Sequence, residues 1–187
     1  MYASHQKMNG DIKIVSNKVL WTFENRTISI EIEDAFFASE RKEMQLIEIE
    51  SGKNFKPNKV FYFNLAGELV LYYDLETGTI EWSLQGNVKK IAIENMKQVG
   101  FFPQEQRIFI ISSCEKQELL GYDIEGKILF KVNNPPEYKM LYFTKLKSNV
   151  IVVRDGGKSN EDKYNRFRHN FFMDINTGKL TKGGLAY

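Results

Sequence analysis

Three turns of similar composition recur along this chain, and each separates two segments in which hydrophobic and polar residues alternate. The clearest, Asp74–Trp82, reads Asp-Leu-Glu-Thr-Gly-Thr-Ile-Glu-Trp; a turn at Asp123–Phe130 is one residue shorter, and a third begins at Asp174. An Asp side chain can cap its own turn, and Gly supplies the positive φ at which a hairpin reverses. The predicted structural residues of these hairpins are Asp74, Gly78, Trp82, Asp123, Gly126, Phe130, Asp174 and Gly178.

The hydrophobic pattern predicts strands from one end of the chain to the other. In 27–33, isoleucine alternates with serine, threonine and glutamate, and 46–50 alternates similarly, as expected for half-buried strands. Only 35–44 has a weak helical pattern, so we expect less than roughly a tenth of the residues to be helical. The predicted strands are 19–23, 27–33, 46–50, 60–64, 68–74, 79–84, 107–112, 118–124, 127–132, 138–143, 150–153 and 169–175.

The turn glycines are spaced like a repeat. Gly78 and Gly126 are 48 residues apart, and Gly126 and Gly178 are 52 apart, lengths that suit one four-stranded antiparallel blade. Gly52 precedes Gly78 by only 26 residues, which indicates either a truncated blade or a different register there. The aromatic residue four positions after Gly, Trp82 or Phe130, is expected in a core between sheets.

These residues resemble the repeat of pyrroloquinoline-quinone-type and WD-type β-propellers, whose outer hairpin reads approximately Asp-x-x-Thr-Gly-x-x-x-Trp. The segment 101–107 resembles the innermost hairpin of such blades, and the resemblance is clearest over 88–182. It implies a fold and no catalytic residue. We therefore predict one all-β domain over 1–187, an antiparallel meander that is propeller-like with about four blades, in a ring that is small, incomplete or closed by another copy. A β-sandwich or clam of the same hairpins is the alternative.

Charge and composition narrow the classes of partner. The 26 basic and 24 acidic residues nearly balance, so no strong field attracts nucleic acid or a membrane surface. Residues 1–11 lack the apolar core of a signal peptide, and the longest apolar runs, such as Ile108–Ile111, are too short to span a bilayer. We expect a cytoplasmic protein without a disulfide, since there is a single cysteine.

Most catalytic chemistries find no support in the residue pattern. The only histidines, His5 and His169, and the single Cys114 have no metal-ligand or nucleophile–base spacing. Gly156–Ser159 ends like a phosphate-binding loop, but Val152 replaces the required glycine and a polar stretch replaces the helix. The segment Asp174–Gly178 lacks the bidentate Glu of a calcium loop and is interpreted as an Asx turn. We expect no metal and no cofactor.

Glutamates alternate with isoleucines in two predicted strands, at Glu31, Glu33, Glu48 and Glu50. A glycosidase needs two carboxylates at a defined separation, one with a raised pKa. The alternation instead predicts a solvated sheet face, and a hydrolase with unassigned acidic residues remains only as an alternative function.

The segment Arg154–Arg168 stands out, because it joins two predicted strands with about fifteen mostly polar residues, far more than the usual few. Cations and aromatics interleave in its second half, a composition that suits anionic or protein partners. It is either a partner-binding loop or a mobile, solvated one. The candidate partner-binding residues are Lys158, Lys163, Tyr164, Arg166, Phe167, Arg168 and His169.

The absence of catalytic groups and the composition of this loop favour a non-enzymatic interaction protein. The first hypothesis is an inhibitor or immunity-type protein, as in bacteria or phage, that blocks a protein partner. The second is a protein that sequesters a small molecule or nucleotide in a pocket at a subunit interface, which leaves an anionic ligand and a homo-oligomer open. The third is the hydrolase named above.

Overall fold

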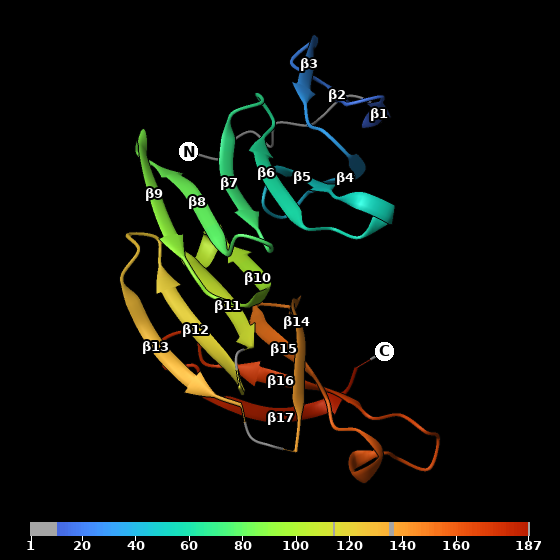
Figure 1. Cartoon of the computed structure of the whole chain (residues 1–187), viewed down its shortest axis with the longest axis vertical. Helices are drawn as coiled ribbons and strands as arrows, with labels where there is room; N and C mark the ends of the chain where they lie inside the picture. Colours follow the sequence, from blue (N-terminus) through green and yellow to red (C-terminus); the bar gives the residue numbers. More distant parts are fainter. Residues whose placement is uncertain (1–10, 114, 135–136, 187) are drawn as a thin grey trace. The chain divides into compact units, whose positions relative to one another are not determined.

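The computed structural model describes residues 11–113, 115–134 and 137–186. Within these ranges the regular structure is 17 strands in four antiparallel sheets, with three short 3-10 turns and no α-helix (Figure 1). The predictions of an all-β antiparallel meander and of negligible helix are confirmed. In every sheet the strand order follows the chain order, so each strand lies beside its neighbours in sequence.

Two sheets come from the first half of the chain. The three-stranded sheet contains β1 (Lys13–Val15), β2 (Lys18–Phe23) and β3 (Arg26–Glu31). The six-stranded sheet contains β4 (Ala35–Arg41), β5 (Leu46–Ser51), β6 (Lys59–Asn64), β7 (Leu69–Asp74), β8 (Thr79–Leu84) and β9 (Asn87–Ala92). A 3-10 turn, Lys53–Phe55, joins β5 to β6.

The second half forms two four-stranded sheets. One contains β10 (Met96–Phe102), β11 (Arg107–Ser113), β12 (Gln117–Asp123) and β13 (Ile128–Asn133). The other contains β14 (Lys139–Leu146), β15 (Asn149–Asp155), β16 (Arg168–Met173) and β17 (Leu180–Leu185). The remaining 3-10 turns are Pro103–Glu105, in the predicted hairpin at 101–107, and Lys158–Asn160.

The chain forms two compact units, Met1–Lys90 and Ile91–Tyr187. In the first, buried residues of β2 and β5 share one core, with Trp21 and Ile47 almost fully buried. The indole Nε1 of Trp21 donates a hydrogen bond of 2.8 Å to the backbone oxygen of Leu65, so its polar atom is satisfied inside this core. That these two units form one domain over 1–187 remains a prediction.

The core of the second unit lies between its two four-stranded sheets. Phe109 and Phe130 of one sheet form a cluster with Val152 and Met173 of the other. The rings of Phe109 and Phe130 stack with centroids 5.9 Å apart, a geometry that aromatic pairs favour. Because both inner faces are apolar, the two sheets bury each other as the layers of a β-domain do.

The three predicted turns have the predicted chemistry. Gly78, Gly126 and Gly178 have φ values of 70°, 88° and 70°. The Asp74 carboxylate accepts hydrogen bonds from the backbone N–H groups of residues 76 and 77, Asp174 does the same for residues 176 and 177, and Asp123 accepts one from residue 127. The Asx turn at Asp174 is thus confirmed, and Trp82 and Phe130 are buried as expected.

One detail of the predicted organisation is wrong, and the short spacing of Gly52 and Gly78 has an explanation. Residues 35–44 are not helical: β4 covers Ala35–Arg41 and pairs with β5, with Ala38 opposite Ile49, so strand pairing overrides the weak helical pattern. Gly52 and Gly78 both belong to connections of the six-stranded sheet, between β5 and β6 and between β7 and β8. Their short spacing therefore reflects a different register.

Candidate partner-binding loop

The long connection predicted near the end of the chain is residues 156–167, which join β15 to β16. It is shorter at both ends than expected. Arg154 belongs to β15 and is only 2% exposed, because this strand is buried on both faces. Arg168 and His169 are the first residues of β16. The loop proper therefore holds five of the seven candidate residues, Lys158, Lys163, Tyr164, Arg166 and Phe167.

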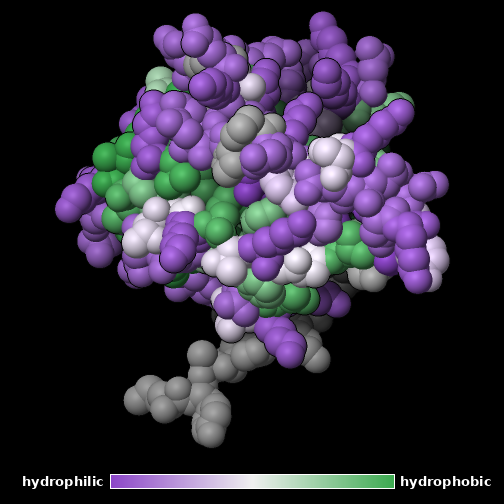
Figure 2. Space-filling view, turned by 90° about the horizontal axis from the view of Figure 1, so that it is seen from below, coloured by the Kyte–Doolittle hydropathy of each residue, from purple (hydrophilic) through white to green (hydrophobic). Residues whose placement is uncertain are grey.

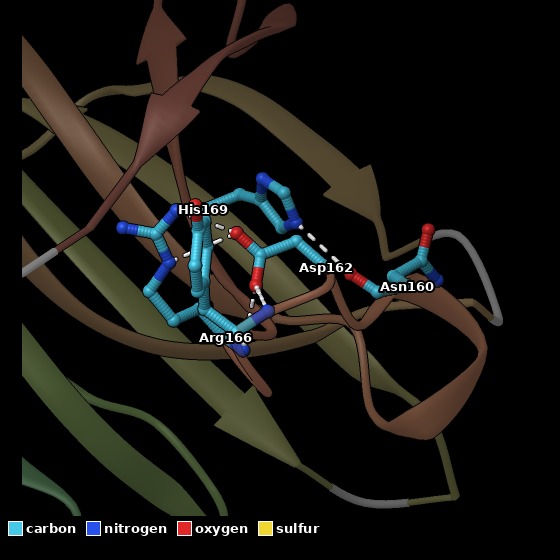
Figure 3. A network of polar contacts seen from close by, with 5 residues as sticks. Asn160, Asp162, Arg166 and His169 are labelled. Atoms are coloured by element: carbon cyan, nitrogen blue, oxygen red, sulfur yellow. Dashed lines mark hydrogen bonds and ion pairs between the residues drawn. The ribbon is translucent and has the colours of Figure 1, made fainter.

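Asp162 organises the second half of the loop (Figure 3). One carboxylate oxygen, Oδ1, accepts hydrogen bonds from the backbone N–H groups of Tyr164 (2.8 Å) and Arg166 (3.1 Å). The other, Oδ2, accepts from Nε (2.9 Å) and Nη2 (2.6 Å) of the Arg166 guanidinium. The Arg166 hydrogen bonds lower the pKa of Asp162 from 3.8 to about 2. This segment is thus a closed Asx turn with an internal ion pair.

Tyr164 stands at the surface of this turn, with 63% of its area exposed. The Nζ atom of Lys163 lies 4.9 Å and the Cζ atom of Arg166 lies 5.0 Å from the centre of its ring. Both distances are within the range of cation–π contacts, which restrict the ring without covering it. An aromatic side chain that is already ordered loses little conformational entropy when a partner covers it.

The first half of the loop is anchored through Asn160. Its Oδ1 accepts a hydrogen bond of 2.8 Å from the Tyr138 hydroxyl, and its Nδ2 donates one of 3.0 Å to the backbone oxygen of Gly156. His169 Nε2 lies 3.4 Å from the backbone oxygen of Asn160 (Figure 3). Lys182 on β17 donates to the Tyr138 hydroxyl at 2.7 Å. His169 therefore helps to hold the loop.

Arg154 contacts Tyr138, the residue whose hydroxyl holds Asn160 in the first half of the loop. Its guanidinium lies 4.8 Å from the centre of the Tyr138 ring and 4.3 Å from that of Phe171, and Nη2 donates to Asn134 at 2.5 Å. Its buried Nε has no hydrogen-bond partner among the described residues, and burial lowers the pKa of the guanidinium. Packing between two rings replaces the usual carboxylate partner of a buried arginine.

The other candidates differ in exposure. Lys158 and Arg168 are exposed, and within the described residues their side chains have no ion pair. Phe167 is half-buried. Its backbone oxygen accepts a hydrogen bond from the N–H of Gly156, and this bond joins the two ends of the loop. Hydrophilic residues cover most of the face in Figure 2, and hydrophobic residues reach the surface between them only in places. Sequence reasoning missed Asn160, Asp162 and the supporting Tyr138, Arg154 and Lys182.

The residues considered for phosphate binding, nucleophilic catalysis or metal binding form no such site where the structure describes them. Residues 158–160 form one 3-10 turn, and Val152 is fully buried in β15, so a phosphate-binding loop does not form. His5 and Cys114 lie outside the described residues. Among the described residues no group of three or more His, Cys, Asp or Glu side chains could hold a metal ion. No helix in the described ranges has the length and apolar character needed to cross a membrane.

The expectation that Glu48 lies on a solvated sheet face is wrong. Glu48 is only 5% exposed and pairs with the Arg41 guanidinium, because β5 is buried on both faces. Burial, together with the charge of Glu48, raises the pKa of Glu50. Glu31 and Glu33 are exposed as predicted. The two acids on β5 thus belong to an ion-paired cluster with the buried Tyr62 and Tyr73, whose pKa values burial also raises.

Comparison with known proteins found structural similarity at low sequence identity. No family model and no curated protein matches it. A Bacteroides caccae protein of unknown function is 11% identical, with a TM-score of 0.37, over 96% of this chain and 57% of that one. A candidate 6-phosphogluconolactonase from Bacteroides fragilis is 9% identical, with a TM-score of 0.41, over 91% and 67%. The designed protein Ika8 is 11% identical, with a TM-score of 0.38, over 92% and 73%.

The chain thus spans little more than half the length of the Bacteroides caccae protein. The fold defines the class to which it belongs, that of all-β proteins built from consecutive antiparallel sheets. No functional conclusion follows from these likenesses.

Proposed function

We propose that this chain is a non-enzymatic binding protein that blocks an acidic protein partner through the loop 156–167 and the adjoining start of β16. The observation that carries the proposal is Tyr164, an exposed aromatic side chain ordered between Lys163 and Arg166 on a turn closed by Asp162. Tyr and Arg are the residues that most often dominate binding energy when a partner desolvates them.

Charge supports an acidic partner. The loop and the first residue of β16 present Lys158, Lys163 and Arg168 at the surface, whereas Arg166 already neutralises Asp162. Exposed cations around a rigid aromatic residue attract carboxylates and discriminate against basic surfaces. The proposed inhibitor needs no catalytic group, since covering a partner's surface is sufficient to block it.

The test is capture of a partner from lysate of the source cells, followed by affinity measurement with the purified partner. Immobilised wild-type chain is compared with the double variant Lys163→Gln/Tyr164→Ala. The matched control is Lys127→Gln/Ile128→Ala. It removes an exposed cation from the turn before β13 and the first residue of that strand, a hydrophobic residue that is 50% exposed. We expect the loop variant to weaken binding at least about tenfold, or about 1.4 kcal/mol, and the control to bind like the wild type.

Added salt should weaken the wild-type complex and have a smaller effect on the loop variant. Equal affinity of the wild type and the loop variant, with unchanged melting temperatures, would refute the proposal. Mass spectrometry of the captured material separates the alternatives, since recovery of an anionic small molecule in place of a protein would favour the sequestering function.

We also propose that the four sheets are blades of an incomplete β-propeller of the pyrroloquinoline-quinone or WD type. Support comes from the second unit, where the Asp–Gly turn joins the third and fourth strands of both four-stranded sheets. A crystal structure in which all four sheets radiate from one axis would bear this out, and two sheets stacked as a closed sandwich would contradict it.

A further inference from the structure

A second exposed aromatic residue lies in the first unit, on the loop 52–58 between β5 and β6. Phe55 has 82% of its surface exposed, the largest fraction of any large hydrophobic residue in the described ranges. Lys53 and Lys56 flank it; both are exposed and, within the described residues, neither makes an ion pair. A partner that covered this ring would remove its apolar surface from water.

The backbone holds Phe55 in a conformation that this residue type rarely adopts. The N–H of Lys56 donates to the oxygen of Lys53 at 3.1 Å, which closes a tight turn whose central residues, Asn54 and Phe55, have φ values of 55° and 56°. Turns with two positive φ values favour Asn-Gly, because a Cβ atom is strained there. Asn54 suits its position, whereas Phe55 occupies the place where glycine would cost least.

The base of the loop is rigid. The N–H of Gly52 donates to the oxygen of Asp34, and the N–H of Asn58 donates to the oxygen of Ser51, each at 3.0 Å. A Cβ atom at position 52 would come within 2.1 Å of the Lys56 oxygen, so only glycine permits this closure. The Phe36 ring meets the Phe55 ring edge-to-face, at 5.9 Å between centroids and 81° between planes. The turn thus presents one supported, exposed ring.

We infer that Phe55, together with Lys53 and Lys56, is a binding surface for an acidic segment of a protein partner. Backbone strain that persists around an exposed side chain is explained when that side chain has a task at the surface. Two exposed lysines next to Phe55 in the sequence favour carboxylates, and the ring supplies the apolar contact on which an interface centres. The inference does not depend on the loop 156–167 and survives if that loop proves to be inert.

The same arrangement occurs at both loops. Lys163, Tyr164 and Arg166 repeat the order cation, aromatic, cation that Lys53, Phe55 and Lys56 show. Lys53 and Phe55 belong to a 3-10 turn and Lys163 follows one, in each case between neighbouring antiparallel strands. The near-balance of charge over the whole chain favours a protein with local acidic groups over a nucleic acid, which would draw on a larger basic field.

The test measures fluorescence anisotropy of a labelled ten-residue peptide in which glutamate alternates with leucine and tyrosine. The variants are Phe55→Ala, Phe55→Gly and Lys53→Gln/Lys56→Gln. Val88→Ala, which changes another exposed hydrophobic residue of the first unit, and Lys13→Gln/Lys18→Gln are the matched controls. We expect each loop variant to weaken binding at least about tenfold and each control to match the wild type. Phe55→Gly should also melt above the wild type, because it releases the strain.

Several results would overturn the inference. One is failure of the wild type to bind the peptide up to about 1 mM. Another is equal peptide affinity of wild type and Phe55→Ala. Phe55-dependent binding of a labelled oligothymidylate without peptide binding would assign the surface to single-stranded nucleic acid. Phe55-dependent dimerisation in sedimentation, again without peptide binding, would assign it to a second copy of the chain.

Discussion

The ring of Phe130 lies directly against the backbone of Gly178, although one belongs to β13 and the other to the turn before β17. A Cβ atom at position 178 would come within 2.5 Å of two ring carbons, and a Cβ atom at Gly121 would come within 2.4 Å of the same ring. Phe130 therefore fills space that two glycines leave open, one in β12 and one in the turn between β16 and β17. This contact joins a turn predicted from sequence to the core between the sheets.

Gly178→Ala should lower the free energy of unfolding by about 2–4 kcal/mol, since it combines a strained φ of 70° with a clash against a buried ring. Chemical denaturation measures the loss. Gly184→Ala is the matched control, because a Cβ atom there meets nothing within 4 Å. Equal stability of both variants would show that Phe130 does not pack on this turn.

The other turn glycines should tolerate substitution poorly for the backbone reason alone. Gly78→Val and Gly126→Val each place a β-branched residue at a φ of 70° or 88°. We expect each to cost about 1–3 kcal/mol of stability through backbone strain. Thermal melts check this, and an unchanged melting temperature in both variants would contradict the turn geometry.

Two substitutions of Arg154 separate the contributions of its packing and of its charge to stability. Arg154→Met keeps apolar contact with the rings of Tyr138 and Phe171 while it removes a buried cation with an unpartnered Nε. We expect this variant to be at least as stable as the wild type, because buried charges are costly to desolvate. Arg154→Ala leaves a cavity and should lose about 3 kcal/mol. Urea denaturation of the pair decides whether packing or charge dominates.

The lowered pKa of Asp162 makes the stability of the loop depend on pH at acid values. Its pKa is about 2 in the folded protein, below its usual value of 3.8, so its ion pair stabilises the folded loop above pH 4 and loses that effect as the pH falls toward 2. Asp162→Asn keeps the acceptor of the Asx turn but not the charge. The stability difference between wild type and this variant should therefore shrink from pH 5 to pH 2, and a difference independent of pH would contradict the ion pair.

Local patterns were sufficient for the predictions about turns and most strands. Asp74, Asp174 and their glycines act through bonds and dihedral angles within five residues, so the sequence contains the whole mechanism. Short strands with little alternation, β1, β9 and β17, were missed, and β10 was noticed only where its last two residues enter the predicted hairpin at 101–107. The residues of β4 have a weak helical pattern of their own, but pairing with β5 makes them a strand.

The parts of the candidate site that depend on distant neighbours could not be predicted. Arg154 reads as a polar loop residue, yet it packs between Tyr138 and Phe171, which lie 16 and 17 positions away. Glu48 reads as an exposed residue of an alternating strand, yet β5 is an inner strand buried on both faces. The sequence of the turn at 53–56 indicates a binding surface, since two lysines flank an aromatic residue there. Its strained backbone is visible only in the structure.

The consecutive strand order of every sheet has a consequence for how the chain folds. Each ladder closes between neighbours in sequence, so the loops that must form are short and their entropic cost is low for an all-β protein. Hairpins can therefore form locally and add strand by strand. The ladder between β15 and β16 is the exception, because residues 156–167 separate its strands. Its closure should be the slowest of the hairpin steps in the second unit, and shortening this loop should speed folding.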